Sequence, residues 1–103
     1  QTQINLPEEF KQRMISFVNE IIGTRGAFLI DENYNILGRI PYKEVESSLP
    51  NLEGTSIVVL DGIVTDEIAK SAEEAEIKYV IGSRVAASSS TVTLLSYDDL
   101  GYR

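Results

Sequence analysis

The chain has 103 residues, of which 43% are apolar and 24% charged, and its formal net charge is −7. This length supports one compact core, and the composition is typical of a globular domain. Cysteine and histidine are both absent, which excludes disulfides, ordinary zinc sites and Ser–His or Cys–His catalysis. There is no apolar run near the ~20 residues that span a bilayer, and no signal-peptide layout. A cytoplasmic protein is therefore expected.

The charge balance bears on the kind of partner. Nine basic residues stand against sixteen acidic ones, whereas proteins bind a phosphate backbone through an excess of lysine and arginine. The balance predicts that this domain alone does not bind nucleic acid, although a global charge does not exclude a local basic patch. It favours a protein partner with a basic surface.

The first predicted element is an amphipathic helix over residues 7–22. Its apolar side chains recur every three or four residues, and Gly23 follows as a helix-terminating glycine. Pro7 and the acidic residues after it suit the start of a helix. Residues 1–6 are expected to be the remnant of a linker from a longer chain.

A β-hairpin is predicted next, with strands over residues 27–30 and 36–40. The turn between them is rich in Asp and Asn, which tolerate left-handed backbone geometry. A short helix over residues 42–49 should follow Pro41. It is expected to end at Leu49, because a residue that precedes proline disfavours helical geometry.

Residues 56–60 form a continuous apolar run, which predicts a strand buried on both faces, as in the centre of a parallel sheet. Thr65 is the predicted N-cap of a helix that extends to about Glu76. Another buried strand follows over residues 78–81. A strand, a helix and a strand in this order predict a right-handed βαβ unit.

The last third of the chain has weaker patterns. Residues 83–90 show none, residues 91–96 form a final predicted strand, and residues 98–103 are expected to be a polar tail. The predicted fold is therefore a single α/β domain over residues 7–97, in which three helices cover a mixed sheet of about five strands.

Two features suggest chemistry. Asp31 and Asp61 each follow a predicted strand, where α/β sheets place ligands, and together they would offer carboxylates to a magnesium ion. The favoured alternative is that each aspartate begins a turn and bonds local backbone. The serines at positions 88–90 resemble a phosphate-binding loop, but a strand follows them instead of a helix, which favours a hairpin connection.

Other residues suggest protein contacts. Ile63 and Val64 are apolar residues in a short loop, which indicates a contact patch unless one of them packs against the following helix. Four tyrosines lie at the ends of elements, and tyrosine is enriched at interfaces: they are Tyr34, Tyr42, Tyr97 and Tyr102. Tyr42 alternatively closes the bottom of the core.

Four short segments in this order and spacing resemble the C-terminal domain of archaeal DnaG-type primases. They are Leu6-Pro7-Glu8-Glu9-Phe10-Lys11, Leu29-Ile30-Asp31-Glu32-Asn33 with Ile40-Pro41, Val59-Leu60-Asp61-Gly62-Ile63-Val64-Thr65, and Ile77-Lys78-Tyr79-Val80-Ile81-Gly82. The similarity extends from about Leu6 to Ser96. The family often carries lysines after the glycine that matches Gly82, where this chain has Ser83, Arg84 and then serines.

The resemblance implies a function through a partner. The family's magnesium-binding catalytic centre lies in a Toprim domain, whose acidic motifs are not found here, so no catalytic residue and no cofactor are expected in this chain. The family makes primers and is also a component of the archaeal RNA-degrading exosome, associated with its S1-domain cap subunit.

Docking to that subunit is the predicted function. The alternatives are a contribution to a magnesium-dependent nucleotidyl-transfer site through Asp31 and Asp61, and a structural buttress for the Toprim domain. The predicted partner-binding residues are Ile63, Val64, Arg84, Val85, Tyr97, Leu100 and Tyr102.

Overall fold

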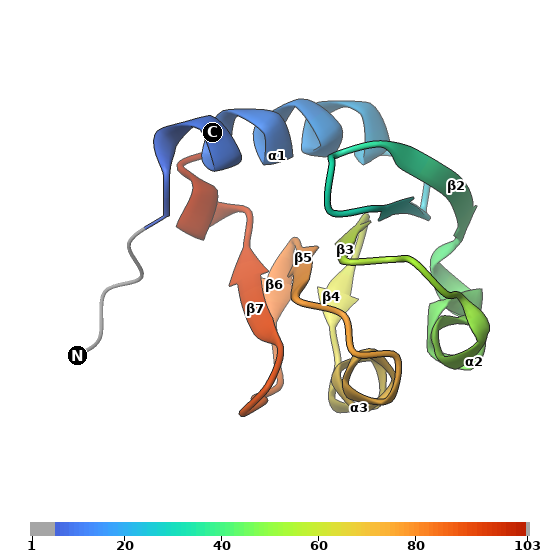
Figure 1. Cartoon of the computed structure of the whole chain (residues 1–103). Coiled ribbons are helices and arrows are strands. Elements are labelled where there is room, and N and C mark those ends of the chain that lie inside the picture. Colours follow the sequence, from blue (N-terminus) through green and yellow to red (C-terminus); the bar gives the residue numbers. More distant parts are fainter. Residues whose placement is uncertain (1–5, 103) are drawn as a thin grey trace.

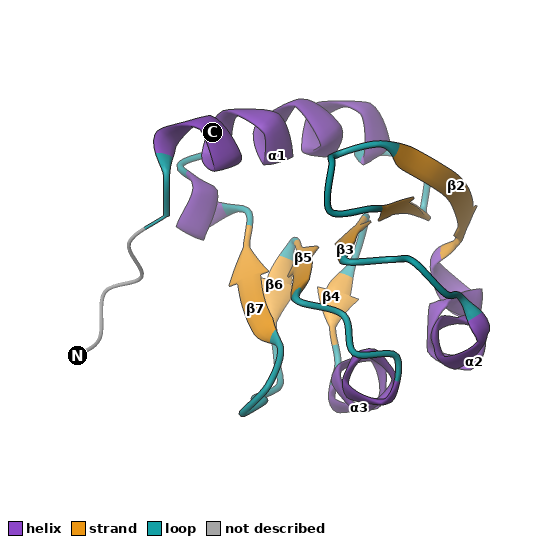
Figure 2. Cartoon of the chain, in the orientation of Figure 1, coloured by secondary structure: helices purple, strands orange, loops and turns teal. Residues whose placement is uncertain are grey.

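The computed structural model describes residues 6–102, which form three layers (Figures 1 and 2). Helix α1 (Glu8–Ile21) lies over one face of the sheet. The short helix α2 (Val45–Ser48) and helix α3 (Asp66–Glu74) lie on the other face. Three 3₁₀ segments complete the helical structure: η1 (Tyr42–Glu44), η2 (Leu49–Asn51) and η3 (Asp98–Leu100).

The central sheet has five strands in the order β2-β1-β3-β5-β7. The strands are β1 (Gly26–Ile30), β2 (Ile36–Pro41), β3 (Ile57–Leu60), β5 (Tyr79–Gly82) and β7 (Thr93–Ser96). Strand β1 is antiparallel to both of its neighbours, whereas β3, β5 and β7 are parallel. The predicted α/β class, hairpin, βαβ unit and mixed sheet are confirmed.

A second, two-stranded sheet was not predicted. Strands β4 (Ile63–Val64) and β6 (Arg84–Val85) pair in parallel just beyond the ends of β3 and β5. The hairpin connection expected around the serines at 88–90 is wrong, because β7 runs parallel to β5. The Ser89 hydroxyl instead donates to the Glu73 carboxylate at 2.6 Å and accepts from the backbone of Val92 at 3.0 Å.

Each face of the sheet has its own hydrophobic core. Along β3, Ile57 and Val59 face α1, while Val58 and Leu60 face α2 and α3. All four side chains are at most 3% exposed. Successive side chains of a strand point to opposite faces, so a continuously apolar strand must lie between two cores.

Two predicted helix ends differ from the observed ones. Leu49 keeps helical geometry (φ −53°, ψ −44°) before Pro50, because proline is tolerated in the first turn of the 3₁₀ segment η2. Helix α3 ends at Glu74, two residues early, since Glu76 adopts a left-handed φ of 58° and the Ile77 N–H bonds the Ala72 carbonyl at 3.0 Å. Its predicted cap is confirmed: the Thr65 hydroxyl accepts from the Ile68 N–H at 3.3 Å.

The expected polar tail is instead part of the folded domain. Leu100, in η3, is buried on the α1 side of the sheet, and Tyr102 packs against the same core. The rings of Tyr97 and Tyr102 meet edge to face, with 5.7 Å between centroids. The expected linker falls largely outside the described residues, and Leu6 packs against the α1-side core. None of the helices in residues 6–102 is long and apolar enough to cross a membrane.

The buried phenol of Tyr97 predicts a loss of stability in alkali. Its hydroxyl donates to the Leu60 carbonyl, and burial, followed by the charges of Asp61 and Tyr102, raises the pKa of Tyr97 to about 12. The unfolded chain ionises near pH 10, so the stabilisation is complete below pH 10 and lost as the pH rises towards 12.

Tyr97→Phe removes this hydrogen bond and should cost about 1 kcal/mol at pH 8. We expect the difference in the free energy of unfolding between wild type and variant to shrink between pH 10 and 12, measured by denaturant titration. A difference that stays constant over this range would contradict the assignment.

Candidate functional site

The two aspartates considered as magnesium ligands lie at opposite ends of the sheet. Asp31 follows the end of β1 and Asp61 follows the end of β3, but these strands are antiparallel, with Ile30 opposite Ile57 and Ala27 opposite Leu60. Three residues of strand, about 10 Å, therefore separate the two ends. This register prevents the two aspartates from binding the same magnesium ion. It therefore also excludes the nucleotidyl-transfer site that they would have formed together.

Asp31 acts as the turn residue that the sequence predicted. Its Oδ1 accepts from the backbone N–H groups of Asn33 and Asn35, both at 2.9 Å, and its Oδ2 accepts from the Asn35 side chain at 3.2 Å. These bonds, chiefly the one from the Asn35 backbone, lower the pKa of Asp31. The carboxylate therefore stabilises the β1–β2 turn.

The prediction that the Asp61 side chain begins a turn and bonds the backbone next to it is wrong. Its Oδ2 accepts from the N–H groups of Gly23 at 3.0 Å and Arg25 at 2.7 Å, which lie 38 and 36 positions earlier in the chain. Both donors have left-handed backbone, with φ of 89° and 55°. Asp61 thus fastens the α1–β1 connection to the end of the central strand.

The predicted contact residues of the two loops are neighbours in the structure. In the β4–β6 ladder Ile63 stands opposite Arg84, and Val64 stands opposite Val85. Ile63 is 39% exposed and Arg84 is exposed, while Val85 is half-buried. Val64 is fully buried in the core under α2 and α3, so its expected role in partner contact is corrected.

Two contact residues predicted near the C-terminus are buried as well. Tyr97 and Leu100 are 8% and 2% exposed, because η3 folds back against α1 and β7. Both act in the core and are not available as a contact surface. Tyr102 remains half-buried at the edge of that core.

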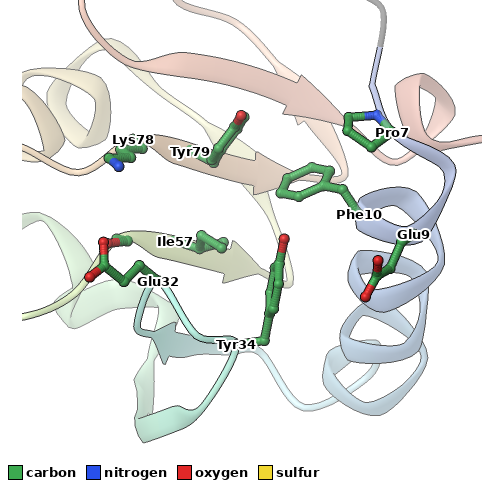
Figure 3. A pocket seen from close by; sticks show the side chains of 9 residues that line it. Pro7, Glu9, Phe10, Glu32, Tyr34, Ile57, Lys78 and Tyr79 are labelled. Atoms are coloured by element: carbon green, nitrogen blue, oxygen red, sulfur yellow. The ribbon is translucent and has the colours of Figure 1, made fainter.

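A pocket of about 400 Å³ lies at the end of the sheet where β3 and β5 begin. Figure 3 shows aromatic rings from three separate segments around it: Phe10 from α1, Tyr34 from the β1–β2 turn and Tyr79 from β5. Ring centroids are 4.7 Å apart for Phe10 and Tyr79, and 6.5 Å apart for Phe10 and Tyr34. We call this the aromatic pocket; its remaining lining residues are Pro7, Glu9, Glu32, Ser56, Ile57 and Lys78.

The aromatic pocket has charged groups at its rim. The carboxylates of Glu9 and Glu32 lie on either side of Tyr34, and the Lys78 side chain lies next to Tyr79, just before β5 begins (Figure 3). The Arg13 guanidinium stacks over the Tyr34 ring, 4.7 Å from its centroid, and pairs with Glu9 at 3.2 Å. One aromatic ring of the pocket, that of Tyr34, thus already contacts a cation.

Tyr34 occupies this position with an uncommon backbone. Its φ of 68° is left-handed, which favours Asn or Gly over an aromatic residue. Its N–H donates to the Asp31 carbonyl at 3.0 Å, which holds the turn closed and places the ring beside Phe10.

The sequence indicated only part of this site. Tyr34 is an aromatic residue at an element end, the pattern that marked it for an interface. Phe10 belongs to the apolar stripe of a helix and Tyr79 to a buried strand, so neither carries a signal beyond core packing. Their meeting depends on tertiary structure. In residues 6–102 no group of three acidic side chains is placed to hold a metal ion.

These features define a small three-layer α/β domain with an aromatic pocket and two separated structural aspartates. No family model matches the chain. It is 32% identical over 103 residues to the DNA primase DnaG of Sulfolobus acidocaldarius, a match to 95% of this chain and 24% of that protein. For the DnaG of Thermococcus kodakarensis the identity is 30%, over 75% of this chain and 16% of that protein. For the DnaG of Pyrococcus furiosus it is 33%, over 68% and 16%.

The chain is therefore a homologue of one segment of the archaeal DnaG primases, which confirms the resemblance seen in the sequence. It spans about a quarter or less of the length of these relatives.

Proposed function

We propose that this chain is a non-catalytic, C-terminal docking domain of a DnaG-type primase, and that it attaches the primase to the S1-domain cap subunit of the archaeal exosome. The relationship to DnaG supports the link to a primase of this type, and the family resemblance suggests the non-catalytic role and the partner. The parent protein would carry its magnesium-dependent chemistry in a separate Toprim domain.

The observation that carries the proposal is the aromatic pocket. Aromatic side chains around a concave surface are the usual hot spots of protein interfaces. Phe10 is buried at the floor, while Tyr34 and Tyr79 are half-buried and present part of their rings to the solvent. The pocket is thus formed before a partner binds, which lowers the entropic cost of binding.

The negative charges at the rim of the aromatic pocket favour a basic segment of the partner. Glu9 and Glu32 are both exposed and acidic, and Arg13 shows that a guanidinium fits against Tyr34. A lysine or arginine of the partner would lay its aliphatic stem on the half-buried rings of Tyr34 and Tyr79 and direct its charge towards the carboxylates.

Capture of the cap subunit by the full-length primase tests this proposal. Tyr34→Asn removes the ring while providing a residue that tolerates the left-handed backbone, so the fold should persist. We expect binding to weaken by about 30-fold, as for loss of an interface hot spot. Ile63→Asn, a change of similar polarity on the sequence-predicted patch, should leave binding intact.

Full binding by folded Tyr34→Asn protein would overturn the aromatic pocket as the docking site. Loss of binding in Ile63→Asn alone would return the docking site to the β4–β6 ladder. If deletion of the domain lowers the melting temperature of the remaining primase and leaves cap binding unchanged, the domain is a structural buttress and the docking function is wrong.

A further inference from the structure

We propose that the end of the sheet opposite the aromatic pocket binds the backbone of a single-stranded nucleic acid. Four exposed basic residues gather there: Arg25, Arg39, Lys43 and Arg84. We call this surface the basic face. It lies beyond the carboxyl ends of β3 and β5, where open α/β sheets bind their ligands.

Three hollows lie on the basic face, and Arg25 lines all of them. One of about 210 Å³ joins Arg25 to Arg39, and another of about 410 Å³ joins it to Lys43. The third, of about 300 Å³, reaches Ile63, whose β-ladder partner is Arg84. Arg25, Arg39 and Lys43 therefore line neighbouring hollows, and Arg84 lies on the strand beside the third.

The charges of the basic face are available for a ligand. In the part of the chain that the structure describes, the ion pairs are Lys11–Glu8 and Arg13–Glu9, both within α1. The carboxylate that lines a hollow of the face is Asp61, and its Oδ2 is occupied by the N–H groups of Gly23 and Arg25. Among the residues that line these three hollows, three are basic and one, Asp61, is acidic, in a chain whose net charge is −7.

The centre of the face is held in place before binding. Asp61 fixes the left-handed backbone of Arg25, and the Tyr42 N–H donates to the Arg25 carbonyl at 2.8 Å. The Tyr42 hydroxyl donates to the Ile63 carbonyl, and its ring lies against Gly62, where a Cβ would come within 2.6 Å of the ring. Arg25 and the half-buried Tyr42 therefore need little ordering when a ligand arrives.

Cations that alternate with hollows beside an aromatic ring suit single-stranded nucleic acid. Its phosphates would contact the basic side chains, and a base would pack against the accessible part of Tyr42. An acidic protein segment would pair with the same charges, but it has no bases to place in the three hollows of about 210, 300 and 410 Å³ around Arg25. A net charge of −7 is compatible with such a site, because the total does not describe how charges are distributed over the surface.

Photo-crosslinking of the full-length primase with a ten-nucleotide RNA that contains 4-thiouridine tests the proposal. Mass spectrometry should locate cross-links in peptides that contain Tyr42 or Ile63. The double variant Arg25→Ala/Arg84→Ala should lose these cross-links. If this domain dominates RNA binding, the double variant should also lower the affinity about tenfold and reduce the salt slope of log K by about 2.

The double variant Lys11→Ala/Lys78→Ala removes the same charge at the other end of the molecule and should keep the cross-links. The proposal is overturned if the basic face carries no cross-link, or if both double variants lower cross-linking equally. It is also overturned if a ten-residue polyglutamate displaces the RNA at lower concentration than unlabelled RNA does, since the face would then bind acidic protein. Cap binding through the aromatic pocket is measured separately, so failure of either proposal leaves the other standing.

Discussion

Replacing Gly82 with alanine is expected to destabilise the domain by about 3 kcal/mol, at the upper end of typical overpacking effects. A Cβ on Gly82 would lie 2.6 Å from the Gly62 carbonyl oxygen and 2.7 Å from Cγ2 of Val64. Val64 is fully buried, and the Gly62 carbonyl already accepts from the Ser83 N–H at 2.8 Å, so neither neighbour yields easily. The melting temperature should fall by roughly 15 °C.

Gly38→Ala is the matched control for this prediction. Gly38 also lies in a strand, but a Cβ there would meet no atom within 4 Å. We expect its melting temperature to stay within a few degrees of wild type, because alanine lowers the entropy of the unfolded chain without a clash. Equal thermal stability of the two variants would show that the close contacts of Gly82 with Gly62 and Val64 do not limit packing at this end of the sheet.

Met14→Ala should be the most damaging substitution in α1. Met14 is fully buried between α1 and the sheet. The smaller alanine side chain would leave a cavity that the surrounding core fills only in part. Such substitutions cost about 2–5 kcal/mol, a large share of a stability that totals about 5–15 kcal/mol in small domains. Chemical denaturation should show a lower midpoint with an unchanged slope.

Ser16→Ala, an exposed change in the same helix, controls for helix propensity and should alter stability by less than about 0.5 kcal/mol. Since Phe10 of the aromatic pocket belongs to the same core as Met14, the Met14 variant should also weaken capture of the partner at temperatures near its melting point. A Met14→Ala protein as stable as Ser16→Ala would contradict the packing of α1 described above.

Local patterns in the sequence predicted most of the secondary structure. The apolar stripe over residues 7–22 required a helix with one buried side, and the continuous apolar run over residues 56–60 required a strand between two cores. Thr65 was identified as a cap because its side chain bonds a backbone N–H only three residues away. Each of these signals arises from neighbours in the chain, so no knowledge of the fold is needed to read it.

The parts that were missed involve contacts between distant segments. Nothing near Asp61 indicates that it binds the backbone of Gly23 and Arg25. The pairing of β4 with β6 joins two-residue strands that are too short to show a period. The polar residues around Tyr97 and Leu100 predict an exposed tail, whereas both side chains are buried in the core where η3 folds back.

The sequence by itself determined that this protein is an α/β domain without histidine or cysteine chemistry, because composition and hydrophobic periodicity are properties of the chain alone. Only the tertiary structure decided which charges and rings lie together. The antiparallel placement of β1 beside β3 sends Asp31 and Asp61 to opposite ends of the sheet. The same arrangement gathers the aromatic pocket at one end and the basic face at the other, since strand order and direction set which loops meet.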